Sequence, residues 1–243
     1  MITPIDVSPD LPIGELVVRA PGLAPVLDRL GLDYCCHGER TLAEACAAAG
    51  LDLATVTGEL ASVPDPGAPE PWTNLSAGEL ADLSAGELAD HIEATHHRFL
   101  HDELPAIDAL AEQVESVHRA RHPELIEVRA LVASLRADLE PHLAKEERVL
   151  FPAIRALAVG RRDFPFGSVA NPIRQMRLEH DAAGELLVEL RKVTDGYAVP
   201  DDACASYRSL YERLEAVERD LRVHIHKENN VLFPRAVELA GSG

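Results

Sequence analysis

Several features that mark other protein classes are scarce in this sequence. The chain of 243 residues has 4% aromatic residues, four cysteines, and 23 basic against 41 acidic residues, a formal net charge of −18. Four unevenly placed cysteines are too few for a secreted disulfide framework. The negative charge would repel phosphate backbones and anionic lipids, and no stretch reaches the ~18 apolar residues of a membrane-spanning helix. The sequence therefore predicts a cytoplasmic protein that binds neither nucleic acid nor membrane.

The residues that are abundant predict an all-α protein. Alanine, leucine and glutamate recur through every long segment, and strand-like alternation is hard to find. A proline-rich stretch from Val63 to Pro71 cannot be helical, so it predicts a domain boundary. We expect a small helical N-terminal domain over residues 1–62, a linker over 63–74, and a larger domain over 75–243. In the first, Gly31 would end a helix, and Thr41 with Glu44 would form a capping box.

The larger domain has the pattern of an antiparallel four-helix bundle. Amphipathic segments run over about 84–117, 123–159, 172–195 and 202–240, with short breaks between them. The octapeptide LSAGELAD occurs twice before the first break, at 75–82 and 83–90, and each copy has its own capping box. Eight residues do not make a whole number of helical turns. We therefore expect the copies to extend the solvent-exposed end of the first helix or its lead-in.

Two stretches of the bundle repeat each other, HLAKEERVLFPAI from His142 and HIHKENNVLFPRA from His224. Each places a glutamate four residues after a histidine, Glu146 and Glu228, so the two side chains share one helical face and can hold one metal ion. Each also has a proline ten residues after its histidine, which predicts a matched helix irregularity. A single pair of this kind on an exposed face would usually be only solvated.

The spacing of two further histidines predicts a site for two metal ions. His97 and His142 are 45 positions apart in the sequence, and His180 and His224 are 44 apart. The two halves of the bundle therefore match, with one histidine on the first helix and His-x-x-x-Glu on the second. Four imidazoles and two bridging glutamates would give each of two ions four protein donors, which suits iron, manganese or zinc. His96 and His101 are neighbours of His97, and the half-to-half offset favours His97 without excluding His101.

Cys35 and Cys36 lie in the segment DYCCHG, in an expected turn before the capping box. Adjacent cysteines form a disulfide only with strain. Exposed thiols beside His37 would be open to oxidation, nitrosylation or metal binding, whereas a buried pair would be simple packing. Cys46 and Cys204 are expected to pack in the core.

DYCCHG together with the doubled His-x-x-x-Glu-x-x-x-Leu-Phe-Pro resembles the iron-sulfur cluster repair di-iron proteins over nearly the whole chain. The resemblance implies a hemerythrin-like domain with two iron ions, held by His97, His142, Glu146, His180, His224 and Glu228. It also implies a cytoplasmic stress-response protein whose clients are iron-sulfur proteins damaged by nitric oxide or oxidants. Such proteins are often dimeric, and the oligomeric state of this chain is left open.

The residues leave the mode of action open. Iron donation, nitric oxide binding at the di-iron site, and a delivery role for Cys35 and Cys36 are all compatible with them. One alternative is a hemerythrin-like carrier or sensor of O2 or nitric oxide, which needs no cysteine pair. Another is an enzyme, a non-haem di-iron nitric oxide reductase, in which no catalytic residue beyond the metal ligands can be named.

Overall fold

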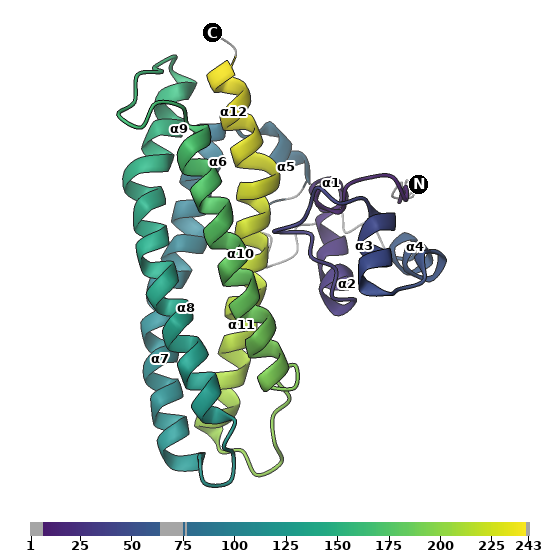
Figure 1. The fold of residues 1–243 in the computed structure, drawn as a ribbon, viewed down its shortest axis with the longest axis vertical. Coiled ribbons are helices and arrows are strands. Elements are labelled where there is room, and N and C mark those ends of the chain that lie inside the picture. The colour runs from purple at the N-terminus through teal and green to yellow at the C-terminus, as the bar shows by residue number, and fades with distance from the viewer. Residues whose placement is uncertain (1–6, 64–74, 76, 242–243) are drawn as a thin grey trace. The chain divides into compact units, whose positions relative to one another are not determined.

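The computed structural model in Figure 1 describes residues 7–63, 75 and 77–241. These residues form helices and no strand, apart from an isolated β-bridge between Pro12 and Thr41. The all-α prediction is therefore confirmed. Within the same residues, no helix has both the length and the apolar character needed to cross a membrane.

The chain folds into two compact units, Met1–Leu88 with Arg222–Gly243, and Ala89–Leu221. Most of the expected linker, residues 64–74, lies outside the described residues. The boundaries expected from sequence, at 62/63 and 74/75, stay a prediction.

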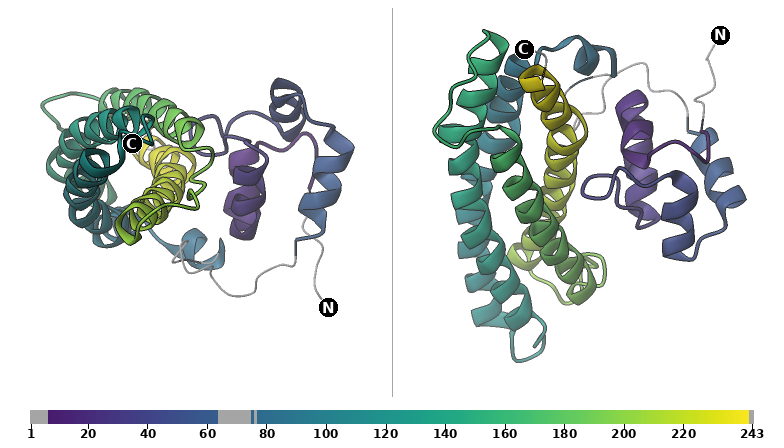
Figure 2. Two further views of the ribbon diagram at one scale, coloured as in Figure 1. Left: turned by 90° about the horizontal axis from the view of Figure 1, so that it is seen from below. Right: turned by 45° about the horizontal axis from the view of Figure 1, so that its top comes forward.

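Four long helices dominate the unit Ala89–Leu221. They are α7 (Arg98–His118), α8 (Leu125–Lys145), α10 (Ala170–Val193) and the part of α11 (Ala205–Lys227) that ends at Leu221, and α8 packs against both α7 and α10. Seen end-on in Figure 2 (left), they surround a common axis. Their inward residues recur at three and four positions and form one apolar core, as an amphipathic helix requires. On α11 these residues are Tyr207, Leu210, Tyr211, Leu214, Val217 and Leu221.

Each of three helical runs is interrupted by a π-helical turn. The turns are η2 (Glu93–His97), between α6 (Ala85–Ile92) and α7; η3 (Glu146–Leu150), before α9 (Phe151–Ala158); and η4 (Glu228–Leu232), before α12 (Phe233–Gly241). Pro152 and Pro234 are the second residues of α9 and α12. A proline cannot donate a hydrogen bond to the preceding turn, and a wider turn accommodates the carbonyl left without its donor. The matched irregularity expected from the two prolines is therefore a π turn in each copy of the repeat.

The unit Met1–Leu88 with Arg222–Gly243 begins with short helices. They are α1 (Ile13–Arg19), the 3-10 turn η1 (Pro21–Leu23), α2 (Ala24–Arg29), α3 (Leu42–Ala49) and α4 (Leu53–Ala61), and they share an apolar core with Ile225 of α11. The predicted capping box is present at the start of α3, because Glu44 N–H donates to Thr41 Oγ1 and Thr41 N–H donates to Glu44 Oε2. Gly31 follows α2 with a φ of 68°, the left-handed conformation that glycine adopts without strain.

The duplicated octapeptide forms two separate helices, so of the two expected arrangements the structure has the lead-in and not one longer helix. The first copy forms α5 (Ala77–Asp82), and the second starts α6 with a capping box between Ser84 and Glu87. Leu80 in the first copy is 4% exposed, and the equivalent Leu88 in the second is fully buried. Arg235 donates to the carbonyls of Leu80 and Leu83 at the end of α5. A turn between the copies thus lets both leucines face inward.

This packing predicts that Leu80→Ala lowers stability. Removing a buried leucine side chain should cost about 2 kcal/mol or more, which for a chain of this size lowers Tm by roughly 4–8 °C. Leu178→Ala is the matched control, because Leu178 on α10 is 58% exposed. Equal melting temperatures for the two variants would contradict the packed role of the first octapeptide.

Candidate metal centre

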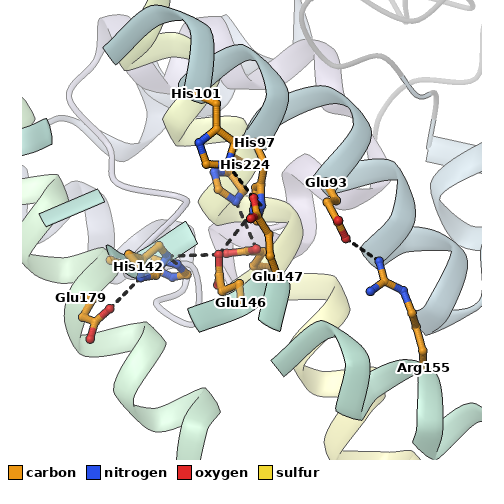
Figure 3. A network of polar contacts seen from close by, with 11 residues as sticks. Glu93, His97, His101, His142, Glu146, Glu147, Arg155, Glu179 and His224 are labelled. Atoms are coloured by element: carbon orange, nitrogen blue, oxygen red, sulfur yellow. Dashed lines mark hydrogen bonds and ion pairs between the residues drawn. The ribbon is translucent and has the colours of Figure 1, made fainter. Parts of the chain in front are cut away.

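One fully buried carboxylate lies between two imidazoles from different helices. Oε2 of Glu146, the first residue of η3, is 3.4 Å from Nε2 of His97 and 3.4 Å from Nε2 of His142 (Figure 3). His97 ends η2, and His142 lies in the last turn of α8. All three side chains are at most 3% exposed. The Nε2 atoms of both histidines therefore face the same carboxylate oxygen.

Two further carboxylates orient these imidazoles. Nδ1 of His97 is 3.1 Å from Glu147 Oε1, and Nδ1 of His142 is 2.8 Å from Glu179 Oε2 (Figure 3). Partial burial raises the pKa of Glu179, but hydrogen bonds from Lys145, Gln175 and His142 outweigh it and lower the pKa to about 2. An ionised carboxylate only accepts hydrogen bonds, so Nδ1 of His142 carries the proton and Nε2 presents a lone pair.

Glu147 acts in the same way on His97. Its partial burial raises its pKa, but hydrogen bonds from His101 and His97 outweigh the burial, and the net shift is downward. Sequence reasoning missed both orienting carboxylates. Each directly adjoins a predicted ligand, Glu147 after Glu146 and Glu179 before His180, but adjacency on a helix does not show which neighbouring helix a side chain reaches.

His180 of α10 completes this side of the centre. Its Nε2 is 3.1 Å from Nε2 of His142, and the side chain is buried. Two nitrogens at this separation can both reach one ion at about 2.1 Å, the usual metal–imidazole bond length.

The second copy of the repeat has the same local geometry. Nε2 of His224, in the last turn of α11, is 3.1 Å from Oε1 of Glu228, the first residue of η4. Both side chains are at most 1% exposed. The His-x-x-x-Glu spacing thus again places a histidine at the end of an α-helix and a glutamate at the start of a π turn.

The six residues predicted as ligands fall into two groups of four. His97, Glu146, His224 and Glu228 form one group, and His142, Glu146, His180 and Glu228 form the other. Within each group the donor atoms lie within 4.8 Å of one another. Buried imidazole nitrogens and carboxylate oxygens without thiolate match the donor preferences of iron, manganese and zinc. The residues fit a metal ion, and their assignment as ligands stays a prediction.

Three other histidines have different partners. Nδ1 of His96 is 2.8 Å from Asp220 Oδ1, and Nε2 of His101 is 2.7 Å from Glu147 Oε1. Nδ1 of His226 is 3.1 Å from Nδ2 of Asn230, and burial lowers the pKa of His226 to about 4. None of the three is in either group found among the described residues.

The π turn η4 also carries two asparagines that sequence reasoning missed. Nδ2 of Asn229 donates to the Cys35 carbonyl at 3.2 Å, and Nδ2 of Asn230 donates to the Tyr34 carbonyl at 3.2 Å. Gly14 and Gly38 make room, because a Cβ on either would lie 2.5 or 2.4 Å from Asn230 Oδ1. A signal was present, since the repeats differ here, with Glu147 and Arg148 in one copy and the asparagines in the other.

The burial of the four cysteines agrees with the prediction except at Cys204. Cys46 is buried as expected, but Cys204 is exposed, with its Sγ 3.1 Å from Nε2 of His118, so its assignment to the core is wrong. Cys35 is buried and Cys36 is half-buried, in the predicted turn.

Comparison with known proteins agrees with this donor set. A family model described as "Hemerythrin HHE cation binding domain" matches residues 88–236, and one described as "Domain of Unknown function (DUF542)" matches residues 9–64. The "Iron-sulfur cluster repair protein YtfE" of Enterobacter sp. (strain 638) is 34% identical over 229 residues, covering 94% of this chain and 97% of the relative. That of Salmonella schwarzengrund is 33% identical over 228 residues, with the same coverage. This chain belongs to the iron-sulfur cluster repair family of hemerythrin HHE proteins.

Family membership places the candidate residues in two matched regions. The six predicted ligands lie in the cation-binding match, and Cys35 with Cys36 lies in the other. The bundle is therefore hemerythrin-like, and its His and Glu groups belong to a cation-binding domain.

We expect Glu179→Ala to weaken metal retention. The change leaves the six candidate ligands in place but removes the acceptor that orients His142, a loss that typically costs 10–100-fold in metal affinity. Glu185→Ala, an exposed glutamate on the same helix, is the control. Iron remaining after timed dialysis against a chelator measures the effect. Identical retention in both variants would show that Glu179 does not position the ligand.

Asn230→Ala should destabilise the protein. It removes the hydrogen bond to the Tyr34 carbonyl, and such a bond typically contributes about 0.5–1.5 kcal/mol to the free energy of unfolding. Asn171→Ala is the control, because Asn171 makes one exposed side-chain bond to the Phe166 carbonyl. Urea unfolding followed by circular dichroism gives the difference. A midpoint for Asn230→Ala that equals the control would mean that the contact contributes nothing to folding.

Proposed function

We propose that this chain is a di-iron protein that repairs damaged iron-sulfur clusters. One observation carries the dinuclear assignment: the two four-residue groups share Glu146 and Glu228 and differ in their histidines. A carboxylate common to two groups has an oxygen for each of two ions, so both glutamates are suited to bridge them. His97 and His224 would hold one iron, and His142 and His180 the other.

The protein residues have defined tasks at this centre. Glu147 and Glu179 keep the protons of His97 and His142 on Nδ1, so that both Nε2 atoms are donors. Complete burial of Glu146 and Glu228 keeps water from competing for their oxygens. Iron held by these residues would supply a centre able to bind nitric oxide or O2 and a store of ions that can be released.

The repair function is inferred from the relatives. Proteins matched over 94% of this chain carry repair of iron-sulfur clusters in their names. The clients would be damaged iron-sulfur proteins in the cytoplasm, with iron as the cargo. Compared with a ferritin-type site, which has four carboxylates, this donor set has two fewer negative charges to retain iron. A site of this kind suits release rather than long-term storage.

The dinuclear assignment predicts the metal content of bridge variants. Glu146→Leu or Glu228→Leu removes a donor common to both groups, so iron should fall below two per chain. Glu127→Leu, at an exposed position on α8, is the control and should keep both irons. Metal analysis with Mössbauer spectra measures the count and the coupling of the ions. Two irons and an unchanged spectrum in either bridge variant would contradict the bridging assignment.

Repair is tested by following iron-57 from the loaded protein into a client. The reduced protein should reactivate a nitric oxide-damaged iron-sulfur enzyme when no other iron is supplied, and the label should enter the client's cluster. A His142→Ala, Glu146→Ala double variant should fail to reactivate it. Full recovery with all label retained would exclude donation and favour nitric oxide removal. Catalytic turnover of nitric oxide with a reductant, without client recovery, would instead support a reductase.

A further inference from the structure

Asp33 is folded against the two adjacent thiols. Its Oδ1 accepts from the backbone N–H of Cys35 at 3.2 Å and of Cys36 at 2.9 Å, and its Oδ2 is 2.7 Å from Nδ1 of His37. Side-chain bonds of this kind define an Asx turn. The Sγ of Cys35 also lies 3.2 Å from the same Oδ1. The turn therefore brings one carboxylate oxygen and two sulfurs together.

The separation of the two sulfurs does not fit a disulfide. Sγ of Cys35 and Sγ of Cys36 are 3.8 Å apart, whereas a disulfide bond is about 2.05 Å long. It does fit two thiolates on one ion. At metal–sulfur bonds of about 2.3 Å, a tetrahedral angle puts the sulfurs roughly 3.75 Å apart.

Electrostatics in the turn favour a bound cation over a reactive thiolate. The hydrogen bond with Cys36, burial and the charge of Asp33 raise the pKa of Cys35 well above that of an ordinary thiol. Burial raises the pKa of Asp33, but bonds from His37, Cys36 and Cys35 outweigh it and lower the pKa, so the carboxylate is ionised. Reactive cysteines need a depressed pKa. Here a thiolate would need a positive ion beside it.

We propose that Asp33, Cys35 and Cys36 bind one thiophilic divalent transition-metal ion such as Zn²⁺ or Fe²⁺. Two metal–sulfur bonds form as two thiol protons leave to solvent, and Asp33 Oδ1 is the third donor. The ion replaces the proton between Cys35 and Asp33. The fourth position is open to water or to a donor from another molecule. These three residues are one of the groups of potential ligands among the described residues, and they share no member with the six-residue centre.

The site has both support and access. The Cys35 carbonyl accepts from Asn229, which anchors the turn from the protein side. The side chains of Asp33 and His37 are 37% and 41% exposed, so an ion can enter past them. A preformed donor set with a supporting shell and an entry path meets the requirements of a metal site.

Co²⁺ is the probe, because tetrahedral thiolate ligation gives it intense sulfur-to-cobalt charge-transfer and visible bands that nitrogen and oxygen ligands do not produce. The full-length, iron-loaded protein is titrated with Co²⁺ under anaerobic, reducing conditions. We expect one Co²⁺ per chain with thiolate bands, and two protons released per ion in weak buffer.

Variants assign the bands to the turn. Cys35→Ser and Cys36→Ser should each lose the bis-thiolate spectrum, and Asp33→Asn should weaken Co²⁺ binding at least tenfold while keeping the Asx turn. A Cys46→Ser, Cys204→Ser double variant is the matched control and should bind as the unaltered chain does. Circular dichroism and iron content show that each variant is folded.

Three results would overturn the proposal: no thiolate band at one equivalent of Co²⁺, loss of the band in the control, or its persistence in a folded Cys36→Ser variant. The test is independent of cluster repair, since it detects thiolate ligation whether or not a client recovers. A retained band with no client reactivation would refute the repair function alone.

Discussion

The burial of Glu146 and Glu228 is the constraint on which the centre depends. Both are fully buried, and an ionised carboxylate taken out of water costs several kcal/mol unless positive charge and hydrogen bonds compensate for it. Histidines from two helices face Glu146, and two metal ions would neutralise both carboxylates. The neighbouring helices place polar groups around these two buried carboxylates. The π turns put each glutamate at a change of helical register, and Glu147 and Glu179 orient imidazoles from outside.

The two copies of the repeat have the same candidate ligands, but the residues that follow these ligands have different partners. The residue after the first glutamate is Glu147, which holds His97, whereas the residue after the second is Asn229, which holds the Cys35 carbonyl. One copy therefore organises the histidines of the bundle. The other joins the predicted centre to the turn that carries the vicinal cysteines. These different partners explain why the two copies differ in sequence here, with EER at residues 146–148 and ENN at residues 228–230.

The π turn η4 connects two candidate groups of metal ligands with different donor atoms. Glu228 belongs to the nitrogen and oxygen donor set, and the next two residues bond to the backbone beside two thiols. Imidazole and carboxylate suit iron, manganese or zinc, whereas thiolates select softer or more tightly bound ions. If the turn holds an ion, a movement of its backbone on metal binding would shift Glu228. Asn229 and Asn230 bond to that backbone and lie in the same π turn as Glu228.

The sequence by itself determined the helices and the six candidate donors, because both follow from local spacing. Apolar residues at three and four positions define a helix face, and His-x-x-x-Glu puts two donors on it. The offset between the two halves already favoured His97 over His96. Only the tertiary structure separated His97 from His101, because packing places His97 against Glu146 and turns His101 toward Glu147. It also decided the roles of Glu147, Glu179 and Asn230, the exposure of Cys204, and the inward face of both octapeptides. These depend on partners far apart in the chain, which local periodicity does not encode.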